Sequence, residues 1–328
     1  MPISIGSPML WIGFNAVVVG LLVLDLWVFH RQAHEVKTKE ALAWSIVWIA
    51  LALLFNLAVG VWFGRDRALE FLTGYLIEKA LSVDNLFVFL VIFSYFSVPA
   101  ALQHRVLFWG IIGALVMRAV FIFAGAALLH TFHWVIFVFG GFLIFTGVKI
   151  LAQKESEVHP EHNPVIKLFK RIIPMTANYD GARFTVVRDG RRLATPLLLV
   201  LLVVESTDVV FAVDSIPAIF AVTKDPFIVY TSNICAILGL RALYFLLAGV
   251  IGKFRYLKVG LGLVLAFVGV KMIVSEYYKI PIGLSLGVVA GLLGGSIIAS
   301  LLRPIAEPPL PVHGPHDPAE GSRGRRPV

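Results

Sequence analysis

The chain has 328 residues, of which 59% are hydrophobic and 15% charged, with a mean hydropathy of +0.88 and a net charge of +8. Typical soluble domains have about 25% charged residues, and here the apolar residues fall in long runs. These features exclude a disordered chain, a coiled coil and an ordinary soluble globule. They predict an all-α polytopic membrane protein, because apolar runs of about 20 residues cross a bilayer as helices.

Two further classes of protein are disfavoured by residue content. The single cysteine, Cys235, cannot form a disulfide framework or a cysteine-rich zinc site. The net positive charge lies mostly in loops and in the C-terminal tail, so it reflects membrane topology and indicates no nucleic-acid partner. The lipid bilayer is the expected partner of the apolar surface.

About nine apolar segments are long enough to cross a bilayer. They cover residues 8–29, 41–63, 71–97, 106–129, 132–152, 196–220, 227–251, 257–278 and 281–302. Twenty Lys and Arg residues fall on one side of these segments and four on the other. Because positive residues concentrate in cytoplasmic loops, this bias predicts an N-terminus outside and a cytoplasmic C-terminus.

Two segments are expected to lie outside the membrane, and residues 1–302 form the transmembrane domain. The polar connection 153–194 is predicted to be cytoplasmic. Within it, Asp189-Gly190 separates two short apolar stretches, which predicts a β-hairpin. The tail 303–328 is rich in proline, glycine and charge, which is typical of disorder.

The two halves of the transmembrane domain share short motifs on three successive spans, at separations of 124, 123 and 122 residues. The pairs are Ser82-Val83-Asp84 with Ser206-Thr207-Asp208, Arg118-Ala119 with Arg241-Ala242, and Gly147-Val148-Lys149 with Gly269-Val270-Lys271. We interpret residues 71–152 and 196–278 as two repeats of three spans each. An odd number of spans makes the repeats inverted, and secondary transporters built in this way bind their substrate at the repeat interface.

Ionisable residues inside spans three and six are the strongest functional signal, because such residues are costly in a bilayer. The candidate transport or metal-binding residues are Asp84, Asp208, Glu78, Asp214, Glu205, Asn85, Ser82, Ser206 and Ser215. The candidate charge-balancing residues are Arg118, Arg241 and Lys79.

The acids are expected to form a ladder across the membrane. Helix rise places Glu78 outward of Asp84 by about 9 Å, and Asp214 outward of Asp208 by a similar amount. Glu205 lies inward of Asp208. Such a ladder indicates a cation path, and the all-oxygen ligand set suits hard divalent cations such as Mn²⁺, Mg²⁺ and Ca²⁺.

A structural interpretation of the same residues stays open. Asp84 and Asp208 would then form buried ion pairs with Arg118 and Arg241. Residues six positions apart on a straight helix also differ by about 120° in direction, so one ion cannot be bound by all of these acids.

Residues 78–85 and 205–217 resemble the two motifs of the TerC family, the tellurium-resistance C and Alx group of bacterial membrane proteins, and residues 231–244 fit as well. The resemblance covers residues 8–302. It implies Mn²⁺ efflux across the bacterial inner membrane, with the acids of the two motifs as the transport site.

The sequence therefore predicts a multi-pass secondary transporter that exports divalent metal cations, with protons as a candidate counter-ion and no resident cofactor. No enzyme is expected, because nucleophile–base and Walker-type motifs are absent from the sequence. The alternative is a membrane scaffold without transport activity that docks partners on residues 153–194. A homo-oligomer is compatible with either function.

Overall fold

The computed structural model describes residues 4–29, 38–132, 134–152, 173–188, 190–248, 256–275, 277–278 and 280–302. The helices are α1 (Pro8–Phe29), α2 (Thr38–Phe63), α3 (Arg65–Tyr95), α4 (Ala100–Thr131), α5 (Val135–Ala152), α7 (Pro196–Phe220), α8 (Pro226–Leu238), α9 (Leu240–Ala248), α10 (Leu257–Val274) and α11 (Ile282–Leu302). The strands are β1 (Thr185–Arg188) and β2 (Arg191–Ala194). The predicted tail 303–328 and residues 153–172 of the connection lie outside the described residues.

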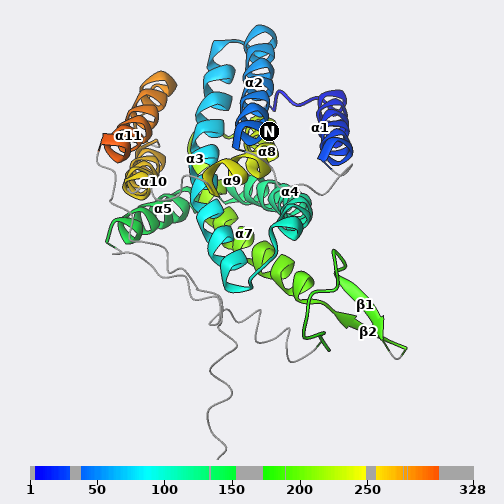
Figure 1. Cartoon of the computed structure of the whole chain (residues 1–328). Coiled ribbons are helices and arrows are strands. Elements are labelled where there is room, and N and C mark those ends of the chain that lie inside the picture. The colour runs from blue at the N-terminus through cyan, green and yellow to red at the C-terminus, as the bar shows by residue number, and fades with distance from the viewer. Residues whose placement is uncertain are drawn as a thin grey trace, which may run out of the picture.

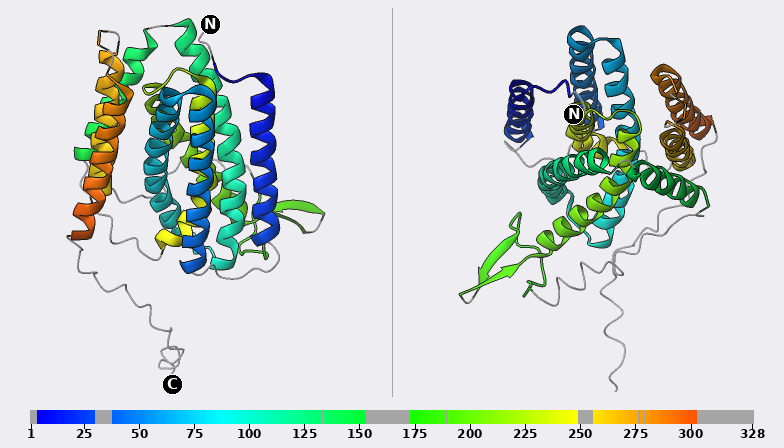
Figure 2. Two further views of the ribbon diagram at one scale, coloured as in Figure 1. Left: turned by 90° about the horizontal axis from the view of Figure 1, so that it is seen from above. Right: turned by 180° about the vertical axis from the view of Figure 1, so that it is seen from behind.

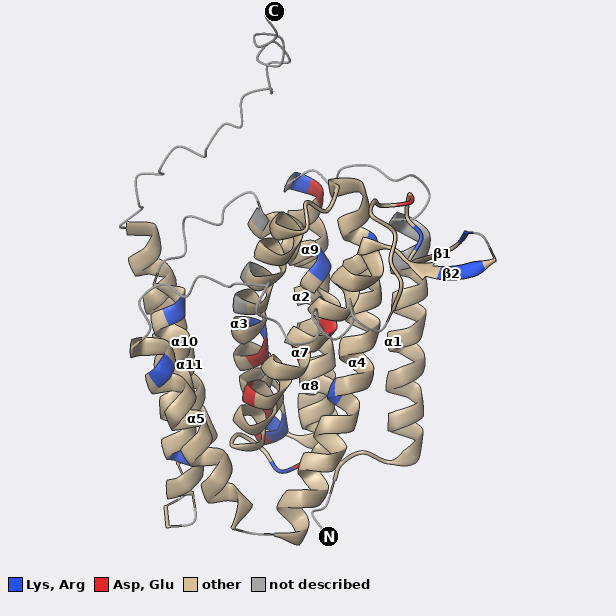
Figure 3. Cartoon of the chain, turned by 90° about the horizontal axis from the view of Figure 1, so that it is seen from below, with Lys and Arg blue, Asp and Glu red and all other residues tan. Residues whose placement is uncertain are grey.

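The helices form a bundle in which α3 occupies the centre (Figure 1). It contacts α2, α7, α8, α9, α10 and α11. Figure 2 shows the helices lengthwise, with α1 along one side of the bundle and α10 and α11 along the other. This arrangement places Glu78 of α3 inside the protein, and Figure 3 shows charged residues in the middle of the bundle, away from its sides.

Within the described residues, six helices are long and apolar enough to cross a membrane, and a bent pair would make seven. The six are α2, α4, α5, α7, α10 and α11. The apolar part of α1 is shorter, and α3 is long enough at 31 residues but carries many charged residues. The structure is therefore that of an all-α polytopic membrane protein. Each of the nine predicted segments overlaps a helix or the bent pair, while nine crossings stay a prediction.

The structure corrects the prediction for the seventh span, residues 227–251, which were expected to form one continuous helix. Instead, α8 and α9 meet at Gly239 with a bend of 42°. Helix α8 begins at Pro226, where the Asp225 side chain accepts a hydrogen bond from the Phe227 amide (2.9 Å). Proline at the first position and aspartate before it are favourable for a helix start.

Helices α5 and α10 approach each other through four glycines. A Cβ atom at Gly147 would lie 2.6 Å from the carbonyl oxygen of Gly262, and one at Gly269 would lie 2.6 Å from that of Gly140. Real side chains do not tolerate these distances. The two backbones therefore touch directly, as is common where membrane helices pack through small residues.

The hairpin has the position that the Asp189-Gly190 pair indicated. Strands β1 and β2 are antiparallel, with Arg188 opposite Arg191 and Val186 opposite Leu193. Val186 is buried, whereas Val187 is exposed. The pair of strands extends from the N-terminal end of α7 and lies beside the bundle (Figure 2).

The contact between α5 and α10 predicts that Gly147→Ala destabilises the protein by about 1–3 kcal/mol, because the two backbones must separate to admit the methyl group. Thermal unfolding of the purified protein in detergent measures this change. Gly141→Ala on the same helix is the matched control, since a Cβ there meets nothing within 4 Å. Equal melting temperatures for the two variants would contradict the close contact.

Candidate functional site

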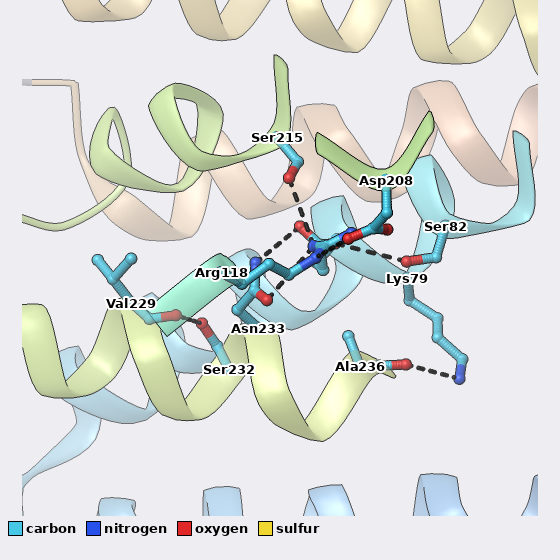
Figure 4. Close-up of polar contacts among 10 residues, drawn as sticks. Lys79, Ser82, Arg118, Asp208, Ser215, Val229, Ser232, Asn233 and Ala236 are labelled. Atoms are coloured by element: carbon cyan, nitrogen blue, oxygen red, sulfur yellow. Dashed lines mark hydrogen bonds and ion pairs between the residues drawn. The ribbon is translucent and has the colours of Figure 1, made fainter. Parts of the chain in front are cut away.

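Arg118 of α4 lies at the centre of a buried charge cluster and is fully inaccessible to solvent. Its guanidinium pairs with the carboxylate of Glu78 on α3. It also donates to both carboxylate oxygens of Asp208 on α7, through Nη2 at 3.2 Å and Nε at 3.4 Å. Glu78 and Asp208 are themselves buried. One guanidinium thus connects carboxylates from two different helices (Figure 4).

Neutral polar side chains supply further hydrogen bonds to the charged groups of the cluster. Asn233 of α8 donates through Nδ2 to Glu78 at 3.0 Å, and its Oδ1 accepts from Arg118 Nη1 at 3.3 Å. The hydroxyl of Ser82 donates to Glu78, and that of Ser215 accepts from Arg118, both at 3.5 Å. Helices α3, α4, α7 and α8 therefore all contribute to one network.

The buried charges of the cluster need these ion pairs and hydrogen bonds. Charged groups inside a membrane protein cost several kcal/mol each unless they are paired and hydrogen-bonded. Two carboxylates and one guanidinium leave a surplus of negative charge. The cluster is consequently suited to hold positive charge, and in this structure the guanidinium of Arg118 supplies it.

The predicted ladder of acids is wrong in one respect. Glu78 was expected on a separate step outward of Asp208, yet both carboxylates contact the same guanidinium. Asp214 does not join them. It accepts a hydrogen bond from the Thr146 hydroxyl of α5 at 3.2 Å. Asp208 and Asp214 face different neighbouring helices, as expected for residues six positions apart.

Glu205 occupies a third position, against α4. A side chain at Gly113 would overlap the Glu205 carboxylate, so the absence of a side chain at Gly113 makes room for it. Ser206 donates to the Val203 carbonyl of its own helix at 2.8 Å. Asn85 is buried on α3. Asp84 lies on the same helix, and its side chain is outside what the structure describes.

Lys79 was predicted to balance the charge of the acids, which stays a prediction; the contact that the structure shows for it is with a backbone carbonyl. Its ammonium donates to the backbone carbonyl of Ala236 on α8 at 3.2 Å (Figure 4). That carbonyl lies in the last turn of α8, before the break at Gly239. A cation at a helix C-terminus is favourable because it compensates carbonyls without an intrahelical partner. Arg241 is buried on α9, two residues beyond the break.

Within the described residues, no group of three or more His, Cys, Asp or Glu side chains could hold a metal ion, and the Asp84 side chain lies outside that set. The surroundings of the acids also include Asn233, Thr146 and Gly113, which were not among the predicted site residues. Asn233 had a signal that could have found it, since an amide in an apolar span must find a hydrogen-bond partner.

The model of the integral membrane protein TerC family matches residues 63–306, which contain the whole charge cluster. The chain belongs to the TerC family. An uncharacterised membrane protein of Myxococcus xanthus is 61% identical over 92% of this chain and 94% of its own length. Proteins named "Putative membrane-bound redox modulator Alx" from Salmonella typhi and Escherichia coli are each 53% identical over 88% of this chain and 93% of their own. No solved structure matches the chain.

The cluster predicts that Arg118→Met destabilises the protein by about 3–5 kcal/mol, because two buried carboxylates lose their counter-charge. The triple variant with Glu78→Gln and Asp208→Asn removes those charges and is expected to recover most of the loss. Thermal unfolding of both variants in one detergent tests this pair of outcomes. A single variant as stable as the wild type would contradict the network.

Proposed function

We propose that the protein is a secondary transporter that exports a divalent cation from the cytoplasm, with Mn²⁺ the expected substrate, and that Glu78 and Asp208 form the core of its transport site. The observation that carries this proposal is the convergence of two buried carboxylates from α3 and α7 inside a membrane bundle. Ionisable residues inside a membrane often mark ion pathways, because burying a charge in lipid costs free energy and such residues are rarely found there without a function.

The chemistry of the surrounding donors supports a hard cation. Beside the two carboxylates, the cluster offers the Asn233 amide oxygen and the hydroxyls of Ser82 and Ser215. Oxygen-only ligand sets suit Mn²⁺, Mg²⁺ and Ca²⁺ better than Zn²⁺ or Cu⁺. Mn²⁺ is preferred here because the resemblance of residues 78–85 and 205–217 to the two TerC motifs implies Mn²⁺ efflux. Asp84 is proposed as a further transport-site residue because it belongs to the same motif, residues 78–85.

Arg118 would act as a tethered competitor of the transported ion. Its guanidinium sits within 3.4 Å of both Asp208 oxygens, and a divalent cation at the same carboxylates would be strongly repelled by it. Binding of the ion therefore requires Arg118 to leave, and release of the ion lets Arg118 return. Protons would act as counter-ions in a similar way, since protonated carboxylates no longer hold the guanidinium.

The contacts between α5 and α10 support the inverted repeat that alternating access would use. A separation of 122 residues makes Gly262 the equivalent of Gly140, and Gly269 the equivalent of Gly147. Gly140 contacts Gly269, and Gly147 contacts Gly262, so each contact is the symmetry mate of the other. Reciprocal contacts of this kind are expected around a two-fold axis. The nine spans, the outside N-terminus and the bacterial inner membrane belong to the same proposal.

Efflux of ⁵⁴Mn²⁺ from preloaded cells tests the transport function. Glu78→Gln and Asp208→Asn are each expected to reduce efflux to the level of cells without the protein, because neutral amides cannot replace two charges around a dication. Asp180→Asn makes the same chemical change at a partly exposed position outside the helices and is expected to retain wild-type efflux.

Membrane abundance of every variant is measured in parallel, so that a folding defect is not mistaken for a transport defect. Equal efflux by wild type and both cluster variants would make the cluster structural. If the wild type itself moves no Mn²⁺, the transporter proposal fails and the scaffold alternative becomes the better one.

The names of the Alx relatives speak of redox modulation, and we propose that such an effect in this chain would follow from metal export. Thiol–disulfide exchange within one chain needs two cysteines, and this chain has only Cys235, on α8. Cys235→Ser is therefore expected to leave ⁵⁴Mn²⁺ efflux unchanged in the same cells. Loss of efflux at equal abundance would assign the thiol a role in transport.

A further inference from the structure

The β-hairpin is held rigidly against the bundle at its base. The Phe184 ring lies 5.3 Å from the Arg105 guanidinium and makes an edge contact with the Trp109 ring, both on α4. The Thr195 hydroxyl donates to the Arg183 carbonyl at 2.7 Å. Tyr179, which precedes the hairpin, donates to the Phe96 carbonyl at 2.8 Å, and burial raises the pKa of its phenol. The direction of the hairpin is therefore fixed by the fold.

The hairpin points away from the side of the helix bundle. Figure 2 shows the two strands projecting beyond the helices near one end of the bundle, and Figure 3 shows the same projection from another side. The aromatic ring of Trp109 at the base is 46% exposed. Exposed tryptophan is typical of the interface between hydrocarbon and water. In a bilayer that meets Trp109 at its interface, a hairpin that projects at this level would extend over the surrounding lipid at the depth of the headgroups.

The described residues of the two strands include three exposed arginines, Arg188, Arg191 and Arg192. Arg188 lies directly opposite Arg191, and Arg192 lies opposite the exposed Val187. Like charges at facing positions destabilise a strand pair, and an isolated two-stranded hairpin is marginal even without them. Arg188 has a partner in Asp180 at 3.3 Å, whereas the side chains of Arg191 and Arg192 make no ion pair within the described residues.

We propose that the tip of this hairpin binds the anionic phospholipid headgroups of the membrane in which the protein sits. Arg192 and Val187 are cross-strand neighbours on one face of the strand pair, where they supply a positive charge and an apolar contact, and Arg191, on the opposite face beside the turn, adds charge that headgroups around the tip neutralise. Each basic residue beside an anionic bilayer is worth about a fivefold change in binding. The interaction holds the connection to α7 on the bilayer surface, and it is independent of whether the protein transports a cation.

The test uses the full chain in lipid nanodiscs, with an environment-sensitive fluorophore on Val187→Cys in a Cys235→Ala background. Discs of phosphatidylcholine alone are compared with discs containing an equal share of phosphatidylglycerol. The anionic discs are expected to shift the emission to the blue and to reduce quenching by aqueous iodide. Salt at about 1 M should reverse both changes, because the Debye length falls to about 3 Å.

Two matched variants assign the effect to the hairpin. Arg191→Gln with Arg192→Gln is expected to abolish the response to anionic lipid. Arg65→Gln with Lys224→Gln removes the same charge from exposed positions at the other end of the bundle and should preserve the response. Identical spectra in the two lipid compositions would overturn the proposal, as would an unchanged response in the Arg191/Arg192 variant. A probe that stays water-exposed in both discs would leave the tip free for an acidic protein partner instead.

Discussion

The buried guanidinium of Arg118 is the interaction on which the arrangement of the central helices depends. It links α4 to carboxylates on α3 and α7, and Asn233 extends the same network to α8. None of these charges is tolerable alone in a low-dielectric interior, because each would keep its desolvation cost without a counter-charge. The relative positions of four helices are thus tied to one side chain, and a change in its charge partners is a change in helix packing.

Close helix approach is the second requirement, and glycines provide it. Gly74 leaves space for Ser232, where a Cβ would lie 2.8 Å from the hydroxyl, and Gly113 leaves space for Glu205. Without a hydrophobic force between helices in lipid, small residues and interhelical hydrogen bonds determine the packing. The charged network and the small-residue contacts therefore depend on each other, since polar side chains reach across only where the backbones are near.

Helix positions and the identity of the buried charges could be predicted from the sequence, because both are local. The predicted span 196–220 has the bounds of α7, and Glu78, Asp208 and Arg118 lie inside the bundle. Which acid meets which cation could not be predicted. It depends on the rotation and tilt of each helix, and these follow from packing against neighbours that the sequence pattern does not specify.

The break between α8 and α9 shows how a local feature follows from a distant contact. A bend at Gly239 exposes carbonyls at the end of α8, and no residue of that helix can compensate them. The Lys79 ammonium does so from α3, at the Ala236 carbonyl. The bend is thus stabilised by a side chain far away in the sequence, which periodicity within residues 227–251 cannot reveal.

Glu78 and Lys79 are adjacent on α3, and they hold α8 at Asn233 and Ala236, less than one turn apart. Any movement of α8 along α3 would break both contacts together. An ion that displaced Arg118 would also change the charge facing the Glu78–Asn233 pair, because Arg118 donates to both residues. On the proposed function, occupancy of the charge cluster would be coupled to the position of α8 and to the bend at Gly239. This coupling is what a transporter requires, since a bound ion must alter the helix packing that separates the two sides of the membrane.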